Sequence, residues 1–198
     1  MNKIIKDALI LLCITLIAGA ALGLVYEITK DPIAKSQEKA KQEAYAAVFE
    51  NATFETDETV TAKVAELGET YDGALVTEVL VAKDATGNVA GYVMSLTAKE
   101  GYGGKITLTM GVAADGKITG LEVLEASETA GLGAKCNEPE FKGQFPGKHL
   151  ASPDGKMEVV KGGGATETQV DAISGATITS RAVTKAVNAG LQFVGALG

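Results

Sequence analysis

The sequence feature that most constrains this chain is an uncharged apolar run near the amino terminus, from Ala8 to Tyr26. As a helix, these 19 residues would be about 28 Å long, close to the roughly 30 Å of bilayer hydrocarbon. Lys3 and Lys6 precede the run. Because positive flanks stay in the cytoplasm, residues 1–30 are predicted to be a single-pass anchor of the cell (inner) membrane, with a short cytoplasmic amino terminus and the rest of the chain on the extracytoplasmic side.

A cleaved signal peptide is the alternative interpretation of this segment. Lys3 and Lys6 would form its charged region, and Ala18-Gly19-Ala20 would be its small-residue cleavage site. The apolar run continues past that site through Val25, so its full length suits a membrane span better. A retained anchor is therefore the favoured prediction.

Charge and composition argue against several classes of function. The chain has 198 residues, a formal net charge of −7, no tryptophan and 5% aromatic residues. With no basic stripe to displace counterions and few rings to stack on bases, nucleic acid is not an expected partner. Cys13 and Cys136 have no Cys or His neighbour at metal-binding spacing, and His149 lies in a loop-like stretch. No metal site is predicted, and any redox chemistry would come from an organic cofactor.

A helical connector is predicted between the anchor and the main domain, over residues 31–70. Asp31-Pro32 is a typical helix start, with a capping carboxylate followed by proline at the first helical position. Apolar residues recur at helical spacing from there to about Phe49.

Alternation of apolar and polar residues predicts an antiparallel sheet in the main domain, residues 71–198. The alternating segments are residues 75–81, 89–97, 105–112 and 117–124. Turn sequences such as Asp115-Gly116 separate them. Residues 127–164 are predicted to be loop with one strand near Met157–Val160, and a closing helix is predicted from about Thr179 to Val194. The expected fold class is α+β, a twisted antiparallel sheet with packed helices.

The segment before the closing helix has the composition of an anion site. It starts at Asp171 and contains Ser174, Gly175, Ala176 and Thr177. A phosphate placed here would meet the unpaired N–H groups of the first helical turn and the positive end of the helix dipole. Residue types alone do not distinguish this segment from an ordinary capped loop.

The order of these residues resembles the recognition sequence of the bacterial flavin transferase, which joins FMN to a threonine through a phosphoester. The matching positions are Asp171, Ser174, Gly175, Ala176 and Thr177. The resemblance implies that Thr177 accepts a covalent FMN, that the other four residues belong to the cofactor-binding segment, and that the transferase is the maturation partner. Thr179 is the competing acceptor, since it too would lie at the helix start.

A second segment points to the same family. Glu128-Thr129-Ala130-Gly131-Leu132-Gly133 resembles the Glu-Thr-Pro-Gly-Leu-Gly loop of FMN-binding domains in the Rnf and Na⁺-translocating quinone reductase complexes. Gly101–Gly104 and Gln144–Lys148 resemble further stretches of these domains. The chain departs from the family at Ala130, where proline is usual, and at Ala126, where many members carry histidine.

The loop from Glu128 to Gly133 has the residue types that a flavin ring needs. Gly131 and Gly133 would let the backbone lie against a flat ring, and Leu132 would supply apolar contact. Glu128 and Thr129 would hydrogen-bond the polar edge of the ring.

The resemblance covers the anchor and nearly the whole main domain, and the chain length favours the G-subunit family of the Rnf ferredoxin:NAD⁺ oxidoreductase. It implies an electron carrier without catalytic residues of its own, acting as one component of a redox-driven ion translocase. The implied partners are iron–sulfur subunits and a second flavin subunit, and the coupling ion is Na⁺ or H⁺. One alternative is the equivalent subunit of a Na⁺-translocating NADH:quinone reductase. The other is a membrane-tethered binding or assembly domain without cofactor.

Overall fold

The computed structural model describes residues 3–150 and 155–197. The chain divides into two units, Met1–Ala40 and Lys41–Gly198. Residues 1–2 of the predicted anchor, and residues 151–154 and 198 of the predicted main domain, lie outside the described residues.

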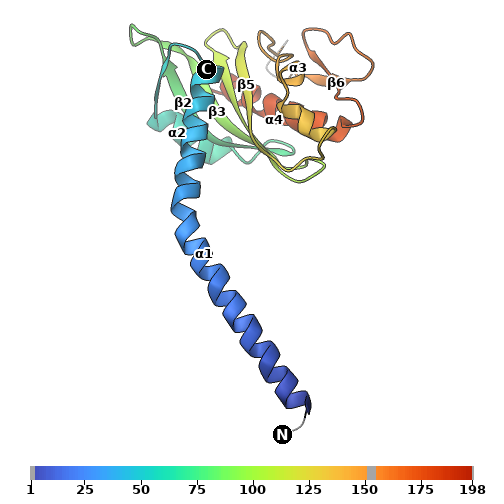
Figure 1. The fold of residues 1–198 in the computed structure, drawn as a ribbon. Helices are drawn as coiled ribbons and strands as arrows, with labels where there is room; N and C mark the ends of the chain where they lie inside the picture. Colours follow the sequence, from blue (N-terminus) through green and yellow to red (C-terminus); the bar gives the residue numbers. More distant parts are fainter. Residues whose placement is uncertain (1–2, 151–154, 198) are drawn as a thin grey trace. The chain divides into compact units, whose positions relative to one another are not determined.

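The first helix, α1, runs without a break from Lys3 to Val48 (Figure 1). Within the described residues it is the one helix long and apolar enough to cross a membrane, and its most apolar stretch is not buried by protein. The predicted helix start at Asp31-Pro32 is wrong, because Pro32 lies inside α1. Proline removes one hydrogen bond, to the Ile28 carbonyl, but the helix is exposed there and solvent can satisfy the freed oxygen.

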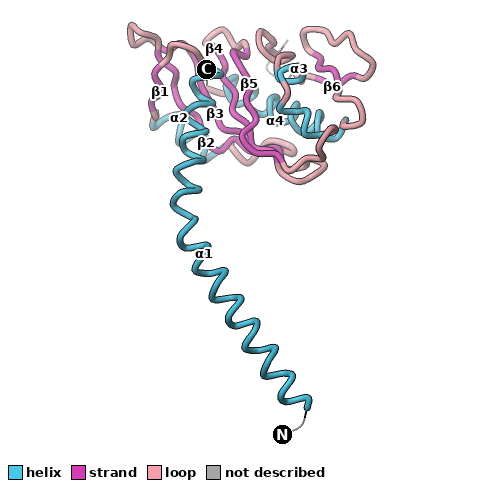
Figure 2. The backbone as a smooth tube through the Cα atoms, in the orientation of Figure 1, coloured by secondary structure: helices cyan, strands magenta, loops and turns pink. Residues whose placement is uncertain are grey.

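The second unit contains a five-stranded antiparallel sheet in the order β1-β2-β3-β4-β5 (Figure 2). The strands are β1 (Thr53–Glu55), β2 (Ala74–Lys83), β3 (Val89–Ala98), β4 (Ile106–Ala113) and β5 (Ile118–Ala126). The four predicted strands and the α+β class are confirmed. Strand β1 was not predicted, since three residues are too few to show alternation. It lies in the range predicted as helical connector, together with helix α2 (Glu58–Leu67).

Helix α4 (Thr177–Gly195) packs on one face of this sheet, against β2, β3 and β4. It begins two residues before the predicted start at Thr179. Gly190 allows the close approach, because a Cβ there would lie 2.8 Å from the Met94 sulfur and 3.0 Å from Leu96 Cδ1. The second half of α4 thereby packs closely on the sheet.

Short elements between β5 and α4 complete the domain. They are the 3-10 helix η1 (Gly133–Asn137), helix α3 (Pro139–Lys142) and the parallel strands β6 (Glu158–Val160) and β7 (Gln169–Asp171). The strand predicted near Met157–Val160 is β6. Its parallel partner β7 was not predicted, because it has one apolar residue between two polar ones, whereas β6 has two consecutive valines.

The last turns of α1 belong to the second unit and carry a buried polar cluster. Tyr45 is fully buried, and its hydroxyl donates to a Glu78 carboxylate oxygen at 2.5 Å and lies 3.0 Å from Ser95 Oγ. Lys41 forms an ion pair with the same carboxylate. Burial alone would raise the pKa of the Glu78 carboxyl, but the hydrogen bonds from Lys41 and Tyr45 outweigh it and hold the pKa below its ordinary value.

This cluster predicts a pH-dependent contribution to stability. A carboxyl whose pKa is lowered by folding stabilises the folded chain above its unfolded pKa, here the ordinary 4.5, and loses that contribution as the pH falls through the folded value. We expect Glu78→Gln to flatten the fall in the free energy of unfolding between about pH 6 and about pH 3, measured by chemical denaturation of the full chain in detergent. Glu69→Gln is the matched control, because Glu69 is exposed and forms no ion pair with a described residue. An equal effect of both substitutions would contradict the prediction.

Candidate functional site

The segment from β7 to α4 is shaped by a tight turn that the helix itself holds. Ala176 N donates to Ile173 O at 2.9 Å, and Gly175 has a φ of +75°, a conformation that glycine adopts at little cost. Ser180, on the first turn of α4, accepts from Ile173 N at 2.9 Å and donates to Ala176 O at 3.0 Å. The position of Thr177 is therefore fixed by hydrogen bonds on both sides of the turn.

Side chains of the Gln144–Lys148 stretch hydrogen-bond to the main chain just before this segment. The Gln144 side chain accepts from Asp171 N at 2.7 Å and donates to Asp171 O at 3.3 Å. Lys148 Nζ donates to the carbonyls of Thr166, at 2.8 Å, and Gln169. Burial lowers the pKa of the Lys148 amine, and the Asp171 and Glu167 carboxylates oppose that shift. These hydrogen bonds fix the position of β7.

Asp171, the first residue of the predicted motif, is the last residue of β7, and the Gln144 side chain binds its main chain. Its carboxylate accepts from Ala165 N at 3.3 Å, and its other oxygen is buried without a hydrogen bond to the described residues. Asp171 does not line the main cavity of the domain, a space of about 800 Å³ beside the turn before Thr177.

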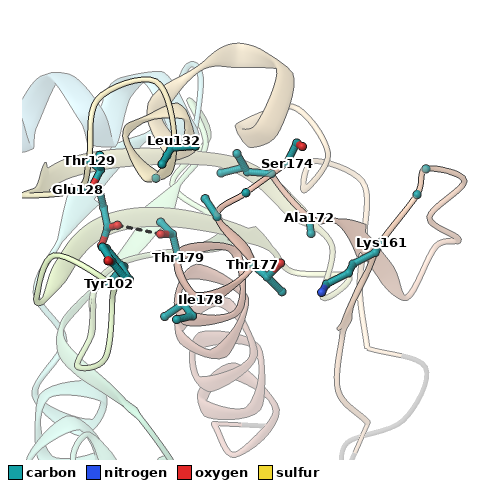
Figure 3. A pocket seen from close by; sticks show the side chains of 16 residues that line it. Tyr102, Glu128, Thr129, Leu132, Lys161, Ala172, Ser174, Thr177, Ile178 and Thr179 are labelled. Atoms are coloured by element: carbon teal, nitrogen blue, oxygen red, sulfur yellow. Dashed lines mark hydrogen bonds between the residues drawn. The ribbon is translucent and has the colours of Figure 1, made fainter.

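A cavity of about 800 Å³ lies beside the turn (Figure 3). That volume is in the range of small-molecule and cofactor sites, about 300–1,000 Å³. Among the predicted residues, those that line it are Glu128, Thr129, Leu132, Gly133, Ser174, Gly175, Ala176 and Thr177. Gly131 is not among them; it has a φ of +75° and serves the bend of its loop. Two segments far apart in sequence therefore meet at one cavity.

Glu128 joins three parts of this site. One carboxylate oxygen accepts from Gly103 N at 3.0 Å, and the other accepts from the Thr179 hydroxyl at 2.8 Å, the contact drawn as a dashed line in Figure 3. Gly133 packs directly against this pair, since a Cβ there would clash with the carboxylate and lie 2.7 Å from Thr179 Oγ1. Glu128 thus fixes the loop to the start of α4.

The two candidate acceptor threonines differ in their surroundings. Thr179 is 1% exposed and its hydroxyl is engaged by Glu128. Thr177 is the first residue of α4, is half-buried and lines the cavity, and its hydroxyl makes no hydrogen bond to any residue described. Ala176, at the N-cap, gives no side-chain cap to the helix. The backbone N–H groups of the first turn therefore remain open to an anion.

Several lining residues were not predicted from the sequence. They are Tyr102, Lys161, Gly162, Gly163, Ala172, Ile173 and Ile178, with Thr179 considered only as a competing acceptor. Tyr102, Leu132 and Ile178 are large apolar side chains left 70%, 44% and 54% exposed around the cavity. A lysine followed by three glycines was the available signal for the segment from Lys161, but the sequence does not show which loop it faces.

The sulfur and carboxylate groups in the described residues form no cluster of three or more that could hold a metal ion. Cys136 is a buried free thiol; burial raises its pKa, and the Glu128 carboxylate adds to the shift. Cys136 does not line the main cavity.

The fold and the cavity define an α+β domain with a cofactor-sized site at the start of its last helix, and comparison with known proteins gives the class. Residues 101–192 match the family model of the FMN-binding domain, and residues 1–48 match that of the RnfG N-terminal region. Among solved structures, NqrC of Shewanella oneidensis is similar, with a TM-score of 0.54 and 29% identity over 60% of this chain and 59% of that one.

The similarity to curated proteins extends over almost the whole chain. The G subunit of the ion-translocating oxidoreductase complex of Methanosarcina acetivorans is 36% identical over 98% of this chain and 96% of its own length. The G subunit of the Na⁺-translocating ferredoxin:NAD⁺ oxidoreductase complex of Acetobacterium woodii is 36% identical over 96% of this chain and 90% of its own length. The chain belongs to the G-subunit family of ion-translocating oxidoreductase complexes.

The packing of Gly133 gives a test of the Glu128 junction. We expect Gly133→Ala to lower the free energy of unfolding by about 1–3 kcal/mol, because its Cβ forces Glu128 and Thr179 apart. Gly195→Ala is the control: nothing lies within 4 Å of a Cβ there, and alanine favours the helix. Denaturant titration of both full-length variants checks this, and equal stability of the two would refute the packing argument.

Proposed function

We propose that this chain is the electron-transfer subunit of a membrane-bound, ion-translocating ferredoxin:NAD⁺ oxidoreductase, and that it carries FMN linked by a phosphoester to Thr177. The support is membership of the G-subunit family, the FMN-binding domain match over residues 101–192, and the ferredoxin:NAD⁺ oxidoreductase complex to which the Acetobacterium woodii relative belongs. The chain alone is an electron carrier; its enzymatic role belongs to the complex.

The observation that carries the assignment of the acceptor is the contrast between two hydroxyls. Thr177 lines the cavity and its Oγ1 makes no hydrogen bond to the described residues, whereas Thr179 Oγ1 donates to Glu128 at 2.8 Å. A nucleophile must be reachable by the flavin donor. Both threonines line the cavity, but Thr179 is 1% exposed whereas Thr177 is half-buried, which favours Thr177.

The residues around the cavity fit FMN. The volume of about 800 Å³, the apolar side chains of Leu132 and Ile178, and the uncapped start of α4 suit an apolar ring and a phosphate. Attachment would form a bond between Thr177 Oγ1 and the flavin phosphorus while the bond to a nucleotide leaving group breaks, with a flavin transferase as catalyst and a flavin dinucleotide as donor. A nucleoside monophosphate leaves, and the proton of the threonine hydroxyl is released to solvent.

The bound flavin would supply the electron-transfer chemistry, and the protein would hold and orient it. Ser180 and Gln144 keep the attachment segment in place, and Glu128 keeps the loop closed against α4. A covalent link also prevents loss of the cofactor, since even nanomolar binding, about 12 kcal/mol, allows escape into a dilute exterior.

The proposed surroundings of the chain follow from α1 and the family. Residues 1–30 would anchor the chain in the cell (inner) membrane with the amino terminus in the cytoplasm, and residues 71–198 would lie on the extracytoplasmic side. The proposed partners are the iron–sulfur subunits and a second flavin subunit of the complex, which couples electron flow to movement of Na⁺ or H⁺.

The equivalent subunit of a quinone reductase is the second candidate, favoured by the similarity to NqrC. That similarity covers 60% of this chain, whereas the two G-subunit relatives match 96% or more of it at 36% identity. The longer match supports the ferredoxin:NAD⁺ complex. Identification of the proteins that copurify with the native chain separates the two.

The attachment site has a direct chemical test. We expect native protein to carry FMN mass on the peptide containing Thr177, and we expect Thr177→Ala to abolish flavin fluorescence in a denaturing gel while the domain stays folded. Thr179→Ser, which keeps the hydroxyl that binds Glu128, should retain the fluorescent band. An unmodified native peptide would contradict the flavoprotein proposal. Flavin on Thr179 would refute the assignment of Thr177 and leave the proposed function unchanged.

The orientation of the chain can be tested separately. In a Cys13→Ser background, we expect Thr86→Cys, in the exposed β2–β3 turn, to react with a membrane-impermeant maleimide in right-side-out vesicles. Ile4→Cys, near the amino terminus, should react only after the vesicles are opened. The reverse pattern would place the flavin domain in the cytoplasm.

A further inference from the structure

Lys161 is the one cation among the described residues that line the cavity. Its interactions with the rest of the described protein do not indicate a structural role. Its side chain is exposed and forms neither an ion pair nor a hydrogen bond with any residue in the described part of the chain. In Figure 3 it extends from the far side of the cavity toward Thr177. An unpaired ammonium directed into a cavity suits an anionic ligand group.

The backbone fixes the place of this lysine. Lys161 follows β6, which pairs in parallel with β7, and Val160 lies opposite Asp171. The ladder continues past the strand, because Ala172 N donates to Val160 O at 2.8 Å. Parallel strands end at the same edge, so Lys161 and the turn that precedes Thr177 emerge side by side.

The charges around the cavity leave Lys161 available for a ligand. Both oxygens of Glu128, the carboxylate that lines the cavity, already accept hydrogen bonds from Gly103 N and Thr179. Gly162 and Gly163, next to Lys161, add no side chain that could compete on this wall.

From this geometry we infer that Lys161 binds the phosphate group of the flavin beside Thr177. The inference rests on the proposed function and adds to it a residue that the attachment motif does not contain. Lys161 supplies the positive charge opposite the flavin phosphate, while the main chain of the turn and of α4 holds the other side. A flavin that lacks the phosphate gains nothing from this lysine.

The test compares two flavins that differ only in the phosphate. The full-length Thr177→Ala chain in detergent cannot form the ester, so FMN and riboflavin are titrated by fluorescence as reversible ligands. We expect Lys161→Gln to weaken FMN binding by about tenfold and riboflavin binding by less than about twofold. Lys161→Arg should keep FMN binding near that of the parent.

Lys117→Gln is the matched control. It removes the same charge from a lysine paired with Asp115 in the β4–β5 turn, so it should change neither titration. Unchanged FMN binding in Lys161→Gln, or an equal loss of both flavins, would overturn the inference.

A second measurement uses the loaded chain and decides the matter where reversible FMN binding is too weak to titrate. Wild-type, Lys161→Gln and Lys117→Gln chains are loaded by flavin transferase, and the ³¹P resonance of the phosphoester is recorded at neutral pH. We expect that resonance to move in Lys161→Gln alone. A resonance that stays in place refutes the role of Lys161, whereas a wild-type chain that cannot be loaded contradicts the proposed function instead.

Discussion

The site depends on one carboxylate, that of Glu128, which accepts from a backbone N–H on the Gly101–Gly104 turn and from the Thr179 hydroxyl on α4. These two hydrogen bonds connect the end of the antiparallel sheet to the start of the last helix. Both are charge-assisted, which makes them stronger than hydrogen bonds between neutral groups. The loop that follows Glu128 can therefore bend over the cavity without depending on a long helix or strand of its own.

This arrangement also separates the two threonines at the start of α4. Residues two apart on a helix do not face the same way. Both threonines line the cavity, but Thr179 is buried with its hydroxyl on Glu128, whereas the Thr177 hydroxyl is unengaged by the described residues. The hydrogen bond from Thr179 to Glu128 thus distinguishes the two candidate acceptors.

The residues that support the segment before Thr177 belong to stretches for which the sequence suggests a different role. Gln144 and Lys148 belong to a stretch that resembles part of a flavin domain, yet they line no part of the main cavity and bind main-chain groups of residues 166–171. Gly133 was expected to lie against a flat ring, whereas its close neighbours are Glu128 and Thr179. A cofactor motif can therefore owe its residues to packing as well as to ligand contact.

Local patterns in the sequence were sufficient for the long apolar helix, the four long strands, the closing helix and the segment around Thr177, because each depends on periodicity or on adjacent residues. Sequence reasoning failed at Pro32, where an exposed helix tolerates proline, and at β1 and β7, three-residue strands with a single apolar residue each. Tyr102 and Lys161 reach the cavity through the Glu128 hydrogen bonds and the β6–β7 pairing, and neither contact can be deduced from local order. The sequence by itself singled out the segment that contains the proposed acceptor; only the tertiary structure decided which of its two threonine hydroxyls is unengaged by the described residues and that Lys161 lines the same cavity, since both depend on contacts between residues far apart in the chain.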